Sequence, residues 1–221
     1  MTKYMIHAVP SRMWYVNDYL IPSMLEQGIR QRDIKIHEDT EHEGNLKSCM
    51  NAFLEVDISE EGTWHMQDDV IICHDFKERT EANDVGIVCA FKSRYDGKLR
   101  AGQVHVRDMW FSFPCIRIPN QIAVDCASWV FKNMIGNQVY KTWWNKGVND
   151  DLIFKQYVKD YCKDALVLNL SPNLVDHVDY LIGGSVNGTK RSNNVVRSSC
   201  WQDEYLVTEL EERLKNVIIN M

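Results

Sequence analysis

The chain is most constrained by one segment, residues 63–72, which reads TWHMQDDVII. An apolar stretch runs directly into two adjacent carboxylates, Asp68 and Asp69. Aspartate is a poor strand residue and is costly to bury without a partner, so we expect this pair at the exposed end of a strand. In a parallel α/β sheet ligands bind at the carboxyl ends of strands, and carboxylate oxygens there suit a divalent cation holding a phosphate. An ordinary turn explains the same residues equally well, because Asp is common in turns.

Composition indicates an ordinary globular protein that is not basic overall. Of the 221 residues, 45% are hydrophobic and 25% are charged, and the formal net charge is −6. Proteins that grip nucleic acid usually present a basic face, so this balance disfavours a nucleic-acid partner. The seven cysteines form no CxxC pair, which excludes a zinc ribbon and fits reduced core thiols in a cytoplasmic, soluble protein. The N-terminus is too short and mixed for a signal peptide, and no apolar run reaches the roughly 20 residues of a membrane span.

Hydrophobic periodicity predicts strands and helices in the order β-α-β-α-β-β between residues 1 and 91. The clearest helix runs from Leu46 to Leu54, where apolar residues recur at helical spacing and Asn45 is the expected N-cap. Pro22 is expected to break or restart an earlier helix. The alternation favours a parallel or mostly parallel sheet with flanking helices. We expect strands at 5–9, 34–36, from 63 to the acid pair, and 84–91, and helices at 12–27 and 45–54.

The second half of the chain is less regular. A Gly-, Asn- and Ser-rich stretch from Gly183 to Ser199 is typical of a flexible loop, and a charged helix from Glu204 to Ile219 follows it. No internal repeat or linker interrupts the chain, so we expect a single α/β domain. The other expected elements are a hairpin or loop at 92–102, strands at 104–106, 110–118 and 165–170, and helices at 122–136 and from 149 onward.

Acidic residues follow two of the predicted strands. Successive strand residues point to opposite faces, so we do not expect Asp68 and Asp69 to hold one metal together. Asp69 lies nearer the strand tip and is the candidate metal ligand, whereas Asp68 is a candidate for a sugar hydroxyl or a water-mediated contact. The acidic cluster at 37–43 lacks the HExxH pattern and reads as a solvated loop, in which Asp39 is a candidate contact for a ribose or base.

The sequence Asn149-Asp150-Asp151 marks a helix start. Acidic residues in a first turn interact well with the helix dipole, which needs no functional reason. A carboxylate at a helix start that faces the sheet edge can also act as a general base. Both interpretations of Asp150 and Asp151 remain open at this point.

The late part of the chain holds a histidine and three cations. His177 follows a proline turn and precedes a glycine-rich stretch, and imidazole with carboxylate and phosphate oxygens is an acceptable ligand set for manganese. Lys190, Arg191 and Arg197 form either a solvated loop or a lid whose charges neutralise a diphosphate. GxGxxG, P-loop and GxSxG patterns are absent, which weighs against dinucleotide-dependent dehydrogenases, P-loop NTPases and serine hydrolases.

Taken in order, these motifs resemble the GT-A family of nucleotide-sugar glycosyltransferases, over most of the chain. Gln67-Asp68-Asp69 is similar to the family's DxD element, but Gln67 replaces the first acid, so the usual contact of that acid is replaced or absent. The other motifs that carry the resemblance are Val9-Pro10-Ser11-Arg12, Asp39, the helix with Asn51, Asn149-Asp150-Asp151, and Pro172 to His177 followed by Ser185 and Gly188.

The resemblance implies a single Rossmann-like GT-A domain (1–221), with a nucleotide-binding half (1–91) and an acceptor half with a flexible C-terminal loop or lid (92–221). It implies that Asp69 and His177 hold Mn²⁺ or Mg²⁺ against the diphosphate of a nucleotide sugar, with a UDP-sugar favoured. Asp150 or Asp151 would then deprotonate the acceptor hydroxyl in an inverting transfer. The residues implied to contact the donor are Pro10, Ser11, Arg12, Asp39, Asn51, Asp68, Lys190, Arg191 and Arg197.

Other functions fit the same residues. A metal-dependent nucleotidyltransferase or phosphoesterase on a related sheet also uses carboxylates at strand ends, and a non-catalytic nucleotide- or sugar-binding module needs only the pocket. The acceptor hydroxyl (glycan, protein or modified nucleic-acid base), the sugar and the oligomeric state are left open. A basic face would favour nucleic acid, and aromatic residues would stack on a sugar unless they pack in the core. The residues concerned are Arg94, Lys98, Arg100 and Arg107 for the basic face, and Trp110, Trp143 and Trp144 for stacking.

Overall fold

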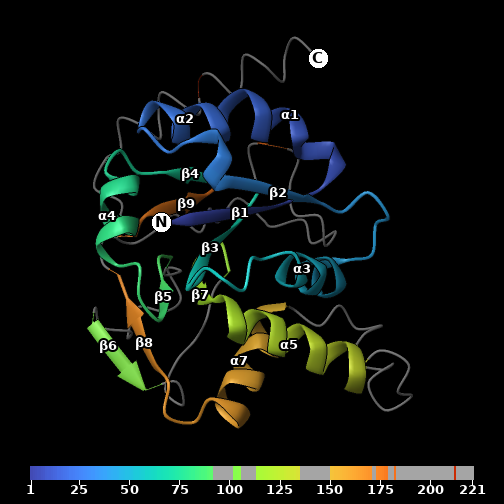
Figure 1. Cartoon of the computed structure of the whole chain (residues 1–221). Helices are drawn as coiled ribbons and strands as arrows, with labels where there is room; N and C mark the ends of the chain where they lie inside the picture. Colours follow the sequence, from blue (N-terminus) through green and yellow to red (C-terminus); the bar gives the residue numbers. More distant parts are fainter. Residues whose placement is uncertain are drawn as a thin grey trace.

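A seven-stranded sheet forms the centre of the part of the chain that this computed structural model describes: residues 1–91, 113–134, 150–170, 173–178, 182 and 212, and the backbone of 102–105 (Figure 1). Its strands are β1 (Lys3–Ala8), β2 (Ile34–Glu38), β3 (Gly62–Gln67), β5 (Ile87–Cys89), β6 (Gly102–His105), β7 (Cys115–Pro119) and β8 (Leu166–Asn169). A second, two-stranded sheet pairs β4 (Val70–Ile72) with β9 (Val175–His177).

The large sheet is mostly parallel. Its strands lie in the order β2-β1-β3-β7-β5-β8-β6. β1 pairs in parallel with β2 and β3, and β5 pairs in parallel with β8. Only β7 and β6 run against the others, because β7 is antiparallel to both β3 and β5, and β6 is antiparallel to β8. The predicted α/β class with a mostly parallel central sheet is confirmed.

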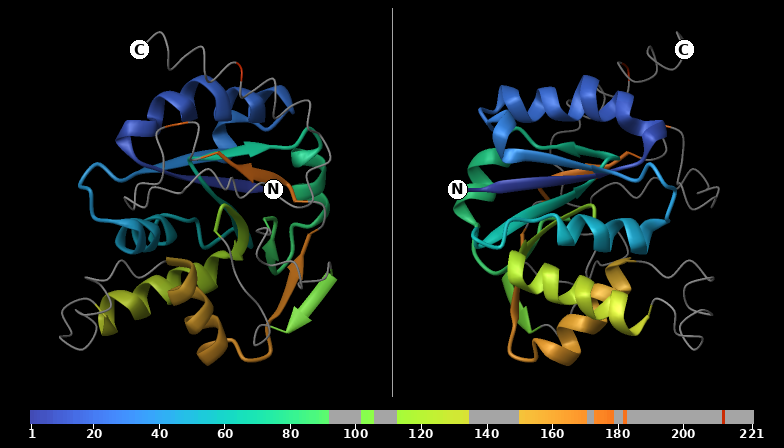
Figure 2. Two further views of the ribbon diagram at one scale, coloured as in Figure 1. Left: turned by 180° about the vertical axis from the view of Figure 1, so that it is seen from behind. Right: turned by 45° about the vertical axis from the view of Figure 1, so that its right-hand side comes forward.

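Helices cover both faces of the sheet (Figure 1 and Figure 2). On one face lie four consecutive helical turns between Pro10 and Glu26, and on the other lie α3 (Asn45–Leu54), α5 (Asn120–Asn133) and α7 (Asp150–Tyr161). The helix α4 (Phe76–Ala82) sits beside β1, where the Tyr4 and Thr80 hydroxyls lie 2.7 Å apart. The four turns are η1 (Pro10–Arg12), α1 (Met13–Tyr15), the π-helical η2 (Val16–Leu20) and α2 (Ile21–Glu26), and η3 (Gln31–Asp33) precedes β2.

Two apolar clusters bury the two faces of the sheet. Tyr4 and Ile6 of β1 pack with Trp64 of β3 in the cluster under α1 and α2. On the opposite face Ile87 packs with Phe53 of α3 and residues of α5 and α7. Burying a large apolar side chain contributes about 1.5–3 kcal/mol, so these clusters hold the three layers together. Burial of both faces is typical of a largely parallel sheet.

The structure differs from the predicted elements in three places. The strand predicted to end at the acid pair ends at Gln67, and β4, which follows the turn at Asp68 and Asp69 and joins the second sheet, was not predicted. The helix α4 was not predicted, because its short length gives too little hydrophobic periodicity. Gly44, with a φ of 83°, takes the N-cap place expected for Asn45. The restart predicted at Pro22 is confirmed, because the π-helical segment ends at Leu20 and α2 begins at Ile21 with Pro22 in its first turn.

Several predicted features lie outside the described residues. These are Asn149, the candidate lid residues Lys190, Arg191 and Arg197, the aromatic candidates Trp110, Trp143 and Trp144, the basic candidates Arg94, Lys98, Arg100 and Arg107, the loop from Gly183 to Ser199, and all but Glu212 of the helix expected from Glu204 to Ile219. Within the described ranges, every helix is too short or too polar to pass through a lipid bilayer.

Candidate functional site

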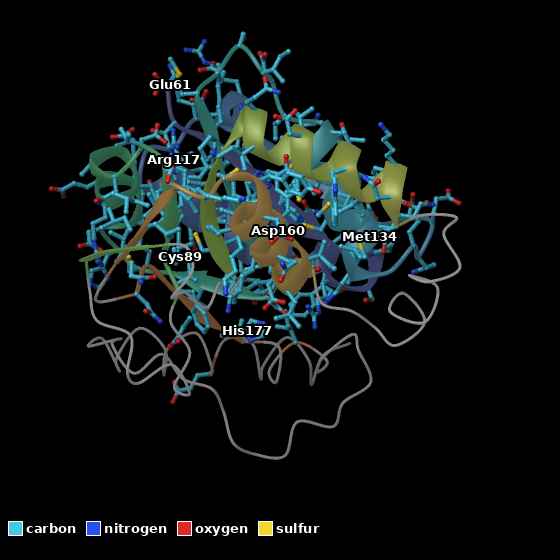
Figure 3. The ribbon with its side chains drawn as sticks, turned by 90° about the horizontal axis from the view of Figure 1, so that it is seen from below. Glu61, Cys89, Arg117, Met134, Asp160 and His177 are labelled. Carbon is cyan, nitrogen blue, oxygen red and sulfur yellow. The ribbon has the colours of Figure 1, made fainter. Side chains whose placement is uncertain are left out.

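The ends of three neighbouring parallel strands form one edge of the large sheet. β2, β1 and β3 lie side by side, so the residues that follow them meet there. The backbone N–H of Asp39, after β2, donates to the Ala8 carbonyl at 2.8 Å. The backbone N–H of Val9, after β1, donates to Asp68 Oδ2 at 2.8 Å. In Figure 3, Glu61 before β3 and His177 beyond its far end lie on opposite sides of the described molecule, which locates His177 at this carboxyl edge.

Asp68 and Asp69 converge on a single nitrogen atom. Arg12 Nη1 donates to Asp68 Oδ1 at 2.8 Å and to Asp69 Oδ2 at 2.6 Å. All three residues are buried, with exposed fractions of 5%, 4% and 6% for Arg12, Asp68 and Asp69. The expectation that the two acids point to opposite faces was wrong, because β3 ends at Gln67 and strand alternation does not extend into the turn.

His177 reaches the same site from a distant part of the chain. β9 pairs antiparallel with β4, which sets His177 opposite Val70, and the Val178 N–H donates to the Asp69 carbonyl at 2.7 Å. His177 Nε2 consequently lies 3.0 Å from Asp69 Oδ1. The two atoms form an ion pair when His177 is protonated, and Oδ1 is otherwise buried without a hydrogen-bond partner within the described parts of the chain.

The two carboxylates have pKa values that move in opposite directions. Burial, followed by the neighbouring Asp69 charge, raises the pKa of Asp68 to about 6, although Arg12 and the Val9 N–H oppose the rise. Burial also acts to raise the pKa of Asp69, but His177 and Arg12 outweigh it, so that pKa falls below its ordinary value. Asp69 is therefore the more strongly ionised of the pair, as a cation ligand must be.

The geometry around Asp69 fits a divalent cation. In octahedral coordination at about 2.1 Å, neighbouring ligand atoms lie about 3 Å apart, which matches the Asp69 Oδ1 to His177 Nε2 separation of 3.0 Å. Within the described ranges no three His, Cys, Asp or Glu side chains gather into a complete metal cluster. Two protein ligands nevertheless suit Mg²⁺ or Mn²⁺, because such ions are commonly bound by one or two side chains with phosphates and water completing the shell.

Asp39 and Asn51 organise the loop before α3. The Asp39 carboxylate is buried and accepts the backbone N–H groups of Glu43 and Gly44 at 2.8 and 3.3 Å. Asn51 Nδ2 donates to Glu43 Oε2 at 2.5 Å, and Glu43 also pairs with Lys47. Both candidates thus lie at or beside the carboxyl edge and are engaged with the chain itself.

Residues Pro10 and Ser11 form the turn η1 that follows β1 at the same edge. Ser11 is exposed and Pro10 is half-buried, whereas the next residue, Arg12, is buried against the acid pair. The turn is closed by the Arg12 backbone N–H, which donates to the Val9 carbonyl at 2.9 Å. The side of the turn that carries Pro10 and Ser11 therefore remains accessible at the strand edge.

Asp150 opens α7 and packs against α3. It is 8% exposed, and its carboxyl group contacts the Cys49 thiol. Burial, followed by the charge of Asp151, raises the pKa of Asp150 to about 7. Asp151 is half-buried, and its Oδ1 accepts the Leu152 N–H at 2.7 Å. The Cys49 contact was not predicted, because it depends on how α3 and α7 pack rather than on local sequence.

A pair of histidines near the end of β1, half-buried His7 and buried His65, was also not predicted. His7 Nε2 lies 2.9 Å from His65 Nδ1, and the Phe53 ring meets both imidazoles edge-on. Burial lowers the pKa of His7 to about 3, so the pair is neutral at physiological pH. The register of β1 against β3 brings the two rings together, and residue patterns along the chain do not determine that register.

The comparisons with known proteins give structural likeness without sequence likeness. No protein-family model and no curated protein matches the chain. The solved inositol-1-phosphate CTP transferase from T. maritima is similar over 97% of this chain and 96% of its own, at 11% identity and a TM-score of 0.50.

Two solved glycosyltransferases are similar with lower TM-scores. Drosophila beta-1,4-galactosyltransferase 7, in complex with manganese, UDP-Gal and xylobiose, is 12% identical over 95% of this chain and 79% of its own, with a TM-score of 0.44. A glycosyltransferase involved in glycosylation of the major capsid of PBCV-1 is 11% identical over 96% of this chain and 98% of its own, with a TM-score of 0.45. The chain has the α/β fold of the T. maritima transferase, and the solved structures similar to it include these two glycosyltransferases.

Proposed function

We propose that this chain is a metal-dependent glycosyltransferase that moves a sugar from a nucleoside diphosphate donor, with a UDP-sugar favoured, to a hydroxyl acceptor. The observation that carries the proposal is the buried Asp69 Oδ1, which pairs with His177 Nε2 at 3.0 Å at the carboxyl edge of parallel strands and has no hydrogen-bond partner among the described residues. A buried carboxylate oxygen without a hydrogen bond is costly unless it has another partner. A divalent cation is the partner that suits both donor atoms.

The residues around this edge account for donor binding. Asp69 and His177 would hold Mn²⁺ or Mg²⁺, which offsets charge on a leaving diphosphate. Pro10 and Ser11 lie exposed or half-buried beside Arg12, and Asp39 lies at the end of the neighbouring strand β2. We assign Pro10, Ser11, Arg12, Asp39 and Asn51 to the part of the site that binds the nucleotide. Asp68 holds the end of β1 through the Val9 N–H and fixes Arg12.

The base for the transfer is assigned to Asp150 or Asp151. The acceptor hydroxyl oxygen attacks the anomeric carbon, its proton passes to the carboxylate, and the bond from that carbon to the diphosphate breaks. The pKa of Asp150 near 7 supports Asp150 as the base, since a general base works best when its pKa lies close to the operating pH. Asp151 is the more accessible of the two. Inversion at the anomeric carbon follows from a single displacement of this kind.

The remaining parts of the proposal concern organisation and setting. Residues 1–91 would form the nucleotide-binding half of one domain, and 92–221 the acceptor half with a lid in which Lys190, Arg191 and Arg197 face the diphosphate. The protein would act in the cytoplasm. Its acceptor is a glycan, a protein or a modified nucleic-acid base, and the net charge of −6 makes nucleic acid the least favoured of the three.

The proposal is tested by incubating the protein with UDP-, GDP- and TDP-sugars, with Mn²⁺ or with EDTA. The expected result is slow donor hydrolysis or binding that requires Mn²⁺ and is lost in Asp69→Asn. Asp160→Asn removes an exposed carboxylate from α7 and is the matched control. The proposal would be refuted if the protein neither bound nor hydrolysed any of these donors, with or without Mn²⁺. Unchanged donor binding by Asp69→Ala would instead indicate a binding module without metal chemistry.

A second candidate function is nucleotidyl transfer. It is favoured by the likeness to the T. maritima CTP transferase over 97% of this chain. The products separate the two candidates, because nucleotidyl transfer from CTP or UTP to a sugar or polyol phosphate releases pyrophosphate, whereas glycosyl transfer releases a nucleoside diphosphate. A metal-dependent phosphoesterase would release free phosphate.

A further inference from the structure

Asp68 and Asp69 already form ion pairs with a cationic side chain of the protein, Arg12. Arg12 Nη1 lies 2.8 Å from Asp68 Oδ1 and 2.6 Å from Asp69 Oδ2. The arginine and both acids are at least nine-tenths buried, so water screens this contact little. Arg12 thereby neutralises one of the two negative charges and keeps the acid pair from repelling itself.

The two cation positions on Asp69 are close neighbours. Arg12 occupies Oδ2, while Oδ1 faces His177 and is the oxygen assigned above to a divalent ion. A guanidinium at one oxygen and a divalent ion at the other oxygen of one buried carboxylate repel each other strongly. The electrostatics therefore oppose simultaneous occupation of both places.

We propose that Arg12 is an exchangeable counter-ion of the Asp68–Asp69 pair: a divalent cation entering at Asp69 displaces the guanidinium, which then binds the donor diphosphate. This inference rests on the proposed function for the identity of the donor. Arg12 stands in the turn η1 at the end of β1, outside the strands of the sheet, so the exchange would move a side chain and leave the strand pairing in place. A guanidinium also binds phosphate oxygens bidentately, which makes the diphosphate a suitable second partner.

The exchange has a consequence for binding that needs no catalysis. In the protein without nucleotide, Arg12 competes with the metal for Asp69, so Mn²⁺ binds weakly. Removing the guanidinium relieves that competition and takes a buried positive charge away from two carboxylates, of which Asp69 keeps His177 beside it. Such a protein is destabilised until a metal replaces the lost charge.

The test measures Mn²⁺ binding without nucleotide, by the EPR signal of free Mn²⁺ and by calorimetry, in the wild type and in Arg12→Met. We expect Arg12→Met to bind Mn²⁺ about tenfold more tightly or better, a difference of about 1.4 kcal/mol. Its melting temperature should be lower than that of the wild type in EDTA and should recover with Mn²⁺. Arg30→Met is the matched control, because Arg30 pairs with Asp33 near the start of β2, away from this edge, and should leave Mn²⁺ binding unchanged.

Arg12→Lys covers the case in which Arg12→Met does not fold. A lysine ammonium cannot reproduce the planar fork of arginine, so we expect about threefold tighter Mn²⁺ binding than in the wild type. Equal or weaker Mn²⁺ affinity in the folded Arg12 variant, or a melting temperature that Mn²⁺ does not restore, would overturn the exchange. A wild-type protein that binds Mn²⁺ but no UDP or UDP-sugar would instead refute the proposed donor, so the two failures are distinguishable.

Discussion

Replacing Asp150 by Asn should change how stability depends on pH. Burial raises the pKa of this carboxyl from 3.8 to about 7. Between these values the folded protein holds a proton that the unfolded chain has released, so the free energy of unfolding falls as pH rises through this window. Each unit of pKa corresponds to about 1.4 kcal/mol, so the ionised Asp150 costs the folded state about 4 kcal/mol above pH 7.

The assay is urea unfolding of the wild type and Asp150→Asn at pH 5 and pH 8. Roughly two thirds of the cost, about 2–3 kcal/mol, arises between these two pH values. Asp150→Asn lacks that titration, so its stability relative to the wild type should rise by this amount from pH 5 to pH 8. Asp160→Asn, an exposed change in the same helix, is the control. A difference between Asp150→Asn and wild type that stays constant across the two pH values would refute the reasoning.

Two further substitutions test the packing that positions the site. Gly62→Ala should lower the free energy of unfolding by about 1–3 kcal/mol, because the new Cβ would lie 2.6 Å from Arg117 Cζ, and this guanidinium is buried and bonded to Asp84. A urea-unfolding curve that coincides with the wild type would contradict that steric argument. Asp39→Ala should cost about 1–2 kcal/mol through the lost acceptors for two backbone N–H groups before α3, and amide exchange of Glu43 and Gly44 should accelerate. Unchanged exchange at these two amides would show that Asp39 does not hold the loop.

The local chemistry of Asp68 and Asp69 was readable from the sequence. Aspartate is unfavourable within a strand, and the strand does end immediately before the pair. The strand β4 after the pair could not be predicted from the sequence, because its residues continue the apolar pattern of β3 although β4 belongs to another sheet. Extending strand alternation through Asp68 and Asp69 led to the wrong expectation that the two side chains point to opposite faces.

Long-range partners explain the other differences. His177 was singled out for its residue type, but its distance to Asp69 depends on the register of β4 with β9, which are far apart in the chain. The ion pairs of Arg12 depend in the same way on β1 lying beside β3. Residue patterns at short range report secondary structure, whereas contacts of this kind arise only from the order of strands in the sheet.

In the proposed site, Asp69 and His177 are the two protein ligands of a cation that also contacts the donor diphosphate. Pulsed EPR of Mn²⁺ bound to the protein with UDP tests it most directly, because hyperfine couplings identify the nuclei next to the ion. The account predicts a phosphorus coupling from the diphosphate together with a histidine nitrogen coupling, and His177→Gln should remove the nitrogen coupling alone. A Mn²⁺–UDP complex on the wild-type protein without any histidine nitrogen coupling would contradict the account.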